Sequence, residues 1–389
     1  MNKKNLQQIF ANYIDRFGEL NDSAHDETFK WWAAAEFRKR MDEALQADNE
    51  NFVAILQNIV KDDVVGTIID GRMQPFNGLV AIASDNHCKL AGDVKQLFLD
   101  LLANDNNNLE KREQKIASFL QRSEELRLST KYSKYYSYKQ TARSVSGYLF
   151  LYDPAHHYMY KASEAHRFAD VIEFYGDWGS GDQINLRAYY KMCDELVAEI
   201  ENCPELKKTD ESRSSIIGRY TSSELANDDS HHILAYDIIF CNYAYDLDRD
   251  ISFKKLSLAE KKFHEERQRK AQEALSEYLQ AEKDYQQLDE AVQHYDSVLV
   301  PGTRVWHRVN GTGIIQNRDN GNIAVQFENG EIFKYDPFAT VFEGYLKFDD
   351  TLDDATAQQY RKLYKERSNT LNMLSIKRHA LKEYADILE

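Results

Sequence analysis

Apolar residues recur at helical spacing along most of the first 255 positions. In each such segment, steps of three and four residues place the apolar side chains on one side of a helix, where they face a core. The segments are 5–20, 26–47, 51–60, 93–103, 109–128 and 184–201. Further helices are predicted after Lys161 and, in a mostly apolar stretch, from His231. The pattern therefore predicts a helical body.

Three stretches of this body lack the helical pattern. The glycine-bearing segment from Gly66 to Gly78 surrounds Pro75 and predicts a turn-rich connection. The run Gly147-Tyr-Leu-Phe-Leu-Tyr152 is short and aromatic, and Asp153-Pro154 ends it, so it predicts a strand. The segment from Thr209 to Ser230 is polar and predicts a loop.

From Leu258 the chain becomes highly charged and carries a seven-residue apolar repeat. Its positions are Ala271, Ala274, Tyr278, Ala281, Tyr285, Leu288, Val292, Tyr295 and Leu299. A returning helix over about 354–388 has a similar rhythm, which Arg367 and Arg378 interrupt. Its apolar positions are Tyr360, Tyr364, Leu371, Leu374, Leu381, Ala385 and Leu388. Such a seam is typical of a coiled coil, and we expect an antiparallel hairpin; because heptads alone do not fix the partner, a coiled coil between two chains is the alternative.

Between these helices the pattern changes to short alternating strands. The predicted strands are 305–308, 313–316, 323–327 and 332–335, separated by the hairpin dipeptides Asn310-Gly311, Asn320-Gly321 and Asn329-Gly330. The predicted fold class is therefore mainly α. It combines a body made of an N-terminal helical region (1–130) and a central region of helices with some strand (131–255), a long antiparallel coiled-coil hairpin (256–300 and 354–389) and a small SH3-like β-barrel inserted at its tip (301–345).

Three motifs in the strand-rich segment carry a resemblance to known small barrels. They are Pro301-Gly-Thr-Arg-Val-Trp-His307, Gly311-Thr-Gly-Ile-Ile315 and Val325-Gln-Phe327. The segment is similar to the barrel appended to UvrD-type repair helicases and to the CarD-type module that interacts with RNA polymerase. The resemblance implies an SH3-like or tudor-like fold with a protein or nucleic-acid partner, although no helicase motif accompanies it. The candidate contacts, several of which would alternatively fill the barrel, are Trp306, His307, Arg308, Phe333 and Tyr335.

Composition narrows the classes of function. The 389 residues carry a formal net charge of −15, so bulk attraction to nucleic acid or an anionic membrane is not expected. The longest apolar runs fall far short of the roughly 20 residues that span a bilayer. The four cysteines form no CxxC pair and no zinc-ligand spacing, and no signal peptide is recognised at the start. We therefore expect a cytoplasmic protein with reduced thiols, no membrane partner, no metal and no cofactor.

Lysines and tyrosines alternate between residues 131 and 143. The candidates are Lys131, Lys134, Tyr135, Tyr136, Lys139 and Arg143. Cations neutralise phosphates and tyrosine rings stack on bases, so this segment is the best nucleic-acid candidate in the chain. The alternative is a strand or loop whose tyrosines pack inward.

The block from His156 to Asp182 gathers histidines and carboxylates around a glycine-rich turn. One interpretation is a metal or acid–base site, because carboxylates beside imidazoles hold divalent cations or move protons. Its candidate residues are His156, His157, His166, Asp170, Glu173, Asp177 and Asp182. No HExxH motif and no paired CxxC motif accompanies them.

Two other interpretations of the glycine-rich turn remain open. Gly176, Gly179 and Gly181 precede a predicted helix and would cradle a phosphate, but no lysine follows as it does in a P-loop. Alternatively the turn is structural, with Trp178 in the core and Asp182 capping the next helix.

A weaker resemblance concerns the start of this block. Leu151-Tyr-Asp-Pro154, followed by Tyr158-Met-Tyr-Lys161 and a helix, is similar to segments of McrB-like restriction proteins and other bacterial defence proteins, and the rest of the body resembles bacterial proteins with no assigned activity. Taken together, we expect a binding or scaffold protein that presents its barrel to a protein or nucleoprotein partner, in bacterial defence or DNA transactions. The alternative is a metal-dependent, nuclease-like enzyme that uses the block from His156 to Asp182.

Overall fold

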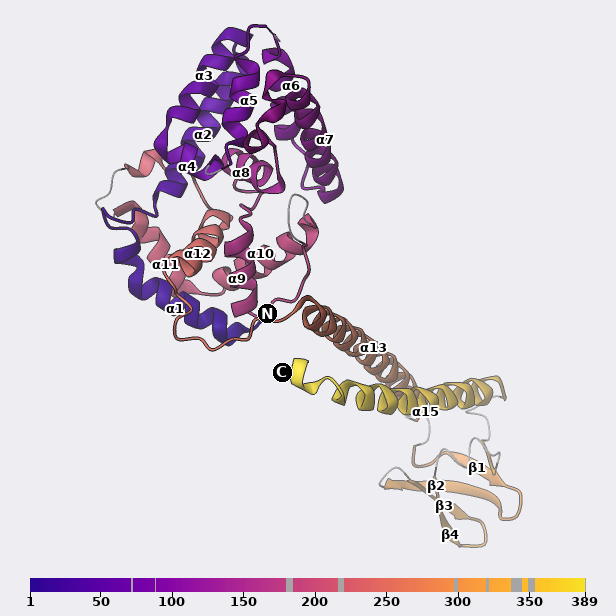
Figure 1. Ribbon diagram of the computed structural model, residues 1–389. Coiled ribbons are helices and arrows are strands. Elements are labelled where there is room, and N and C mark those ends of the chain that lie inside the picture. The colour runs from indigo at the N-terminus through magenta and orange to yellow at the C-terminus, as the bar shows by residue number, and fades with distance from the viewer. Residues whose placement is uncertain are drawn as a thin grey trace. The chain divides into compact units, whose positions relative to one another are not determined.

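The computed structural model describes residues 1–70, 73–87, 89–179, 185–215, 220–296, 300–319, 322–336, 345–348 and 354–388. It is mainly helical, with a curled five-stranded antiparallel sheet near the C-terminus (Figure 1). The chain divides into two units, Met1–His264 and Glu265–Glu389. Five expected features lie outside the described residues, as do the side chains of Tyr295 and Tyr360. They are Cys88, Gly181, Asp182, Leu299 and the Asn320-Gly321 turn.

Helices make up the first unit. Their bounds are α1 (Lys3–Leu20), α2 (Phe29–Gln46), α3 (Asn49–Lys61), α4 (Asp63–Ile69), α5 (Pro75–Ala83), α6 (Ala91–Leu102), α7 (Leu109–Leu128), α8 (Ala142–Tyr152), α9 (Ala162–Val171), α10 (Leu186–Glu201), α11 (Pro204–Glu211) and α12 (His232–Ala244). Short 3-10 turns are η1 (Lys131–Lys134), η2 (Tyr136–Tyr138), η3 (Ser212–Ser215) and η4 (Ser222–Glu224). The expected helices are confirmed to within a few residues at each end.

Two expectations for this unit were wrong, because capping and burial decide the local structure. The expected strand at Gly147 lies inside α8, whose first turn is closed by a capping box between Thr141 and Ser144. In the expected turn-rich connection, the Asp62 carboxylate caps α4 and Pro75 occupies the first turn of α5. The expected loop after Thr209 is largely confirmed in the described residues, where α11 ends at Glu211 and only the short turns η3 and η4 follow before α12.

One hydrophobic cluster extends through the first unit, from Leu6 in α1 to Leu247 after α12. It contains buried residues from both sides of position 130. Helix α12 is buried around most of its circumference and packs against α1, α2, α9 and α10. Beside it, the rings of Phe76, Phe98, Phe119 and Tyr148 contact one another with centroids 5.6–6.1 Å apart. Burial of each such ring stabilises the fold by about 1.5–3 kcal/mol.

The second unit combines the long helix α13 (Leu258–Asp296), most of which lies in it, with α15 (Asp354–Lys382), α16 (Ala385–Leu388) and the sheet. The strands are β1 (Arg304–His307), β2 (Gly311–Asp319), β3 (Asn322–Phe327), β4 (Ile332–Tyr335) and β5 (Leu346–Phe348). Their order in the sheet is β4-β3-β2-β1-β5. The four expected strands are present, whereas β5 is too short for its sequence to have indicated it.

The two faces of the sheet differ in what covers them. Its inner face forms a small core from Val305, Ile315, Ile323, Val325, Phe327 and Leu346. Val292 of α13 belongs to this core, and Leu363 and Tyr364 of α15 pack against it. Gly313 lies on the same face, where a Cβ would come within 2.7 Å of Val325. The opposite, outer face is therefore the one that remains exposed.

Ion pairs connect α13 and α15. Arg367 contacts Asp289 at 2.5 Å, and Lys377 contacts Glu277 at 2.6 Å, so residue numbers rise along one helix as they fall along the other. Arg367 was expected to interrupt the apolar rhythm, yet it is half-buried. Leu371, expected in the seam, is 48% exposed. The less exposed side of α15 at this level is formed by Arg367, Thr370 and Leu374 instead.

A matched pair of glycine substitutions tests the contact between α5 and the turn at Tyr138. A Cβ at Gly78 would lie 2.5 Å from the Tyr138 Cβ and 3.0 Å from its Cα, so Gly78→Ala should lower the free energy of unfolding by about 1–3 kcal/mol. Gly18, in the exposed part of α1, has nothing within 4 Å, and Gly18→Ala should raise it by about 0.5–1 kcal/mol. Urea unfolding followed by circular dichroism measures both, and equal effects would contradict the contact.

Candidate functional sites

The carboxylates of the block from His156 to Asp182 lie in two different environments. Asp170, at the end of α9, is buried and forms an ion pair with Lys261, near the start of α13. Asp170 and Glu173 line one cavity of about 90 Å³ together with Lys254, Lys261 and His264. Asp177, in contrast, accepts a hydrogen bond from the Gly179 backbone N–H at 2.9 Å and so shapes the glycine-rich turn.

The histidines of the block also separate. His166 stacks on the buried ring of Trp178, with centroids 5.0 Å apart, and burial lowers the pKa of His166. His156 and His157 line a different cavity, of about 560 Å³, with Arg38, Tyr152 and Asp153. There His156 Nδ1 lies 2.8 Å from an Asp153 oxygen. In the described part of the chain, the histidines and carboxylates of this block do not bring three ligand atoms within 4.8 Å of one another.

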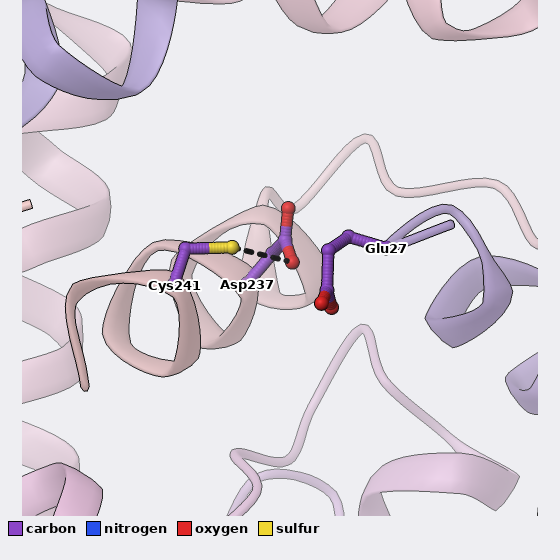
Figure 2. Close-up of side chains that lie close together, drawn as sticks. All are labelled: Glu27, Asp237 and Cys241. Carbon is purple, nitrogen blue, oxygen red and sulfur yellow. Dashed lines mark hydrogen bonds between the residues drawn. The ribbon is translucent and has the colours of Figure 1, made fainter. Parts of the chain in front are cut away.

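Another place does bring such atoms together. Glu27, Asp237 and Cys241 are buried, and one potential ligand atom of each lies within 4.8 Å of the others (Figure 2). Cys241 Sγ lies 3.5 Å from Asp237 Oδ1, one turn earlier on α12. Glu27 reaches them from the turn before α2. Two carboxylates and a thiol are ligand types that bind divalent metals.

The buried side chain of Lys30 determines what this cluster does. Its Nζ donates to Glu27 and, at 2.5 Å, to Asp237 Oδ1, and the side chain is 0% exposed. The ammonium thus occupies the position between the carboxylates that a metal cation would take. Burial alone would lower the pKa of Lys30, but attraction to Asp237 and Glu27 outweighs it and the pKa is raised. Burial raises the pKa of the Cys241 thiol, which stays protonated. The donor set therefore fits a buried ion network better than a metal site.

The network extends to two further elements. Tyr13 of α1 donates to Asp237 Oδ2 at 2.5 Å, and Arg213 of η3 donates to Tyr13 Oη at 2.8 Å. Arg213 also pairs with Asp210 at 3.0 Å and lies 3.6 Å from the centre of the Trp31 ring. Burial would raise the pKa of Asp237, but Lys30 and Arg213 hold it below its ordinary value. The network joins α1, α2, α11–η3 and α12 in the middle of the first unit. Sequence reasoning missed it.

The lysine–tyrosine segment forms the turns η1 and η2 and is not a strand. Its alternative interpretation holds for two of the four tyrosines, because Tyr132 packs against the core and Tyr138 packs against Gly78. Tyr135 and Tyr136 are 52% and 63% exposed. Lys134 and Arg143 are also exposed, whereas Lys131 forms an ion pair with Asp85 at 3.0 Å. Lys139 lies over the Tyr136 ring, 5.7 Å from its centre.

The candidate contacts of the sheet fall on both of its faces. Trp306, on the outer face, is 43% exposed, and Arg308 is exposed in the turn after β1. His307, Phe333 and Tyr335 surround the buried Phe327, with ring centroids 5.8–6.4 Å apart. These three rings thus extend the inner core at its rim, as the alternative interpretation expected, although Phe333 and Tyr335 remain partly exposed.

No family model, curated protein or solved structure matches this chain. The likeness of residues 301–345 to UvrD-type and CarD-type modules thus stays a prediction. Among the described residues, no helix has the length and apolar character needed to cross a bilayer.

Removal of the buried ammonium tests the network. Lys30→Met leaves Glu27 and Asp237 buried without their cation, and we expect the free energy of unfolding to fall by about 3–5 kcal/mol. Lys39→Met on the exposed side of the same helix is the control and should change it little. In Lys30→Met/Asp237→Leu the loss should be clearly smaller than the sum of the two single losses. Strict additivity would show that the two residues act independently.

The pH dependence of stability tests the buried His157. Burial, together with the Arg112 charge, lowers the pKa of His157 to about 3. The unfolded chain, with a histidine pKa of about 6.5, therefore binds more protons between these values, so stability falls as pH falls. From pH 7 to pH 5 this group should remove about 2 kcal/mol. The measurement is urea unfolding of wild type, His157→Gln and the exposed neighbour His156→Gln. Only His157→Gln should flatten the pH dependence; a flattening in His156→Gln instead would contradict the assignment.

Proposed function

We propose that this chain is a binding protein that presents the outer face of its C-terminal sheet to a partner. The single observation that carries the proposal is the composition of that face. Cross-strand pairing aligns Arg304, Ile314, Gln326 and Ile332 in one row. Trp306 lies between Thr312 and Lys347 in the next row. Exposed apolar side chains that gather on one surface are typical of an interaction site.

The charges of the outer face indicate the kind of partner. The strand residues of this face include the cations Arg304, Lys334 and Lys347. The acids nearest to it in the strand register are Asp319, opposite Asn322 at the end of β2, and Glu328, which follows β3 beside Thr312. The whole chain has a net charge of −15, so a cationic face is a local feature of an acidic protein. A tryptophan among isoleucines and cations favours an acidic protein surface that also offers apolar side chains. We infer a protein component of a nucleoprotein machine, in bacterial defence or another DNA transaction.

The two long helices that flank the sheet in the chain, α13 and α15, support this proposal. The sheet would be a small barrel of the SH3-like or tudor-like kind, and α13 with α15 would form an antiparallel coiled-coil hairpin that bears it. In support, Ala271 and Val292 of α13 are buried, and Tyr278, Tyr285 and Leu288 between them are half-buried. Ion pairs from Arg367 and Lys377 fix the register of the two helices. We place the protein in the cytoplasm, where its free cysteines Cys193, Cys203 and Cys241 would stay reduced.

The metal-dependent alternative has less support. Asp170 and Glu173 share a cavity, but Lys261 forms an ion pair with Asp170 and so competes with a metal for that carboxylate. The cavity, at about 90 Å³, is also far smaller than a usual small-molecule site of roughly 300–1,000 Å³. We therefore do not propose an enzymatic function for this block.

Paired variants of the full chain test the proposed face. Trp306→Ala/Ile314→Ser removes the apolar centre of the outer face and should reduce recovery of the bound partner at least tenfold in quantitative affinity purification from the native host. Val309→Ser is the control, because Val309 is highly exposed but lies in the turn between β1 and β2. Circular dichroism verifies that both variants fold. Equal recovery with the two variants would overturn the proposal.

A further inference from the structure

The turn formed by η1 and η2 displays two adjacent aromatic rings to solvent. Tyr135 and Tyr136 are among the most exposed large side chains of the first unit. The Tyr135 ring stacks on Tyr138, with centroids 5.3 Å apart and planes at 18°, and Tyr132 contacts both. A soluble protein has no packing reason to expose tyrosine rings in succession. Their common feature is a flat surface on which another planar group can stack.

Hydrogen bonds from neighbouring residues hold the backbone of this turn in place. The largely buried Arg127 donates through Nη1 to the carbonyl oxygens of Ser133, at 2.6 Å, and of Tyr132 and Tyr135, each at 3.4 Å. The Gln74 N–H donates to the Ser137 carbonyl at 2.8 Å, and Gly78 allows the close approach of Tyr138. The rings are therefore held in place before any ligand arrives. A ligand would not have to order this loop, which lowers the entropic cost of binding.

The charge around the rings is positive. Lys134 and Arg143 are exposed, and neither has a carboxylate within 4 Å among the described residues. Lys139 lies over the Tyr136 ring. Lys131 contributes less, because Asp85 pairs with it. Lys139 thus lies beside the Tyr136 ring, and Lys134 directly precedes Tyr135, in a protein whose overall charge would repel polyanions from most of its surface.

We propose that this turn is a binding site for single-stranded nucleic acid. Two successive bases would stack on Tyr135 and Tyr136, and the phosphates that link them would lie beside Lys134 and Lys139. Stacking on exposed aromatic rings with cations along the backbone is the general chemistry of sequence-tolerant single-strand binding. A duplex would bind more weakly, because its paired bases are not available to stack. The site is independent of the outer face of the C-terminal sheet.

Fluorescence anisotropy of the full chain with labelled 20-nucleotide single strands, DNA and RNA, tests this site. At 50 mM salt we expect saturable binding, with weaker binding of the duplex of the same sequence. The logarithm of the affinity should fall with the logarithm of salt concentration with a slope of about −1.4, from roughly 0.7 per contact over two cations. Absence of binding to any single strand, or equal affinity for the duplex, would overturn the proposal.

Matched variants separate stacking from charge. Tyr135→Ala/Tyr136→Ala should lower the affinity at least tenfold, whereas Tyr135→Phe/Tyr136→Phe should retain it, because phenylalanine keeps the ring. Lys134→Glu should weaken binding and flatten the salt dependence. Tyr243→Ala and Lys39→Glu are controls at exposed positions elsewhere in the first unit and should have little effect. If polyglutamate displaces the strand as well as unlabelled strand does, or if the alanine pair behaves like Tyr243→Ala, the turn is only a polyanion or peptide contact and the proposal is wrong.

Discussion

One ammonium group without access to water constrains how the helices of the first unit meet. Lys30 lies between Glu27 and Asp237, and each of these charges would cost several kcal/mol if it were buried alone. A shift of α12 by one residue would turn Asp237 by about 100° around the helix and leave the ammonium facing apolar side chains. The hydrophobic cluster would tolerate several similar packings, whereas the ion network is satisfied in one. Tyr13 and Arg213 extend the same requirement to α1 and to the segment after α11.

The sequence predicts the helices well because their signal is local. Apolar periodicity places α1, α2 and α7 to within a few residues, and Asn-Gly turns with alternating residues place the hairpins of the sheet. Predictions from local sequence were wrong where burial in the fold outweighs the secondary-structure preference of a segment. The aromatic run at Gly147 has the composition of a strand, yet it forms a helix because α8 is buried on most sides. Leu371 follows the heptad rhythm but is exposed. The polar Arg367 is half-buried instead, because it forms an ion pair with Asp289.

The candidate sites were harder to predict than the fold because they depend on distant partners. Asp170 reads as a free carboxylate in the sequence, and only the fold shows that Lys261, 91 positions later, neutralises it. The ion network had a usable signal. Lys30 shares the inward side of α2 with Ala34, Phe37 and Met41, and Asp237 interrupts an otherwise apolar helix. A charged residue at an inward position of a helix indicates that it has a buried partner of opposite charge. The sequence alone does not show which residue that partner is.

The pairing of β1 with β5 has a consequence for how the second unit is built. The strand that follows α13, β1, and the strand that precedes α15, β5, are neighbours in the sheet, with Val305 opposite Phe348 and His307 opposite Leu346. The chain therefore enters and leaves the sheet at adjacent positions. An insert with adjacent ends can be lengthened, exchanged or lost without separating the helices on either side of it. The pairing of α13 with α15 therefore does not depend on the length or sequence of the inserted sheet. The exposed residues of the sheet can change while its connections to the two helices stay the same.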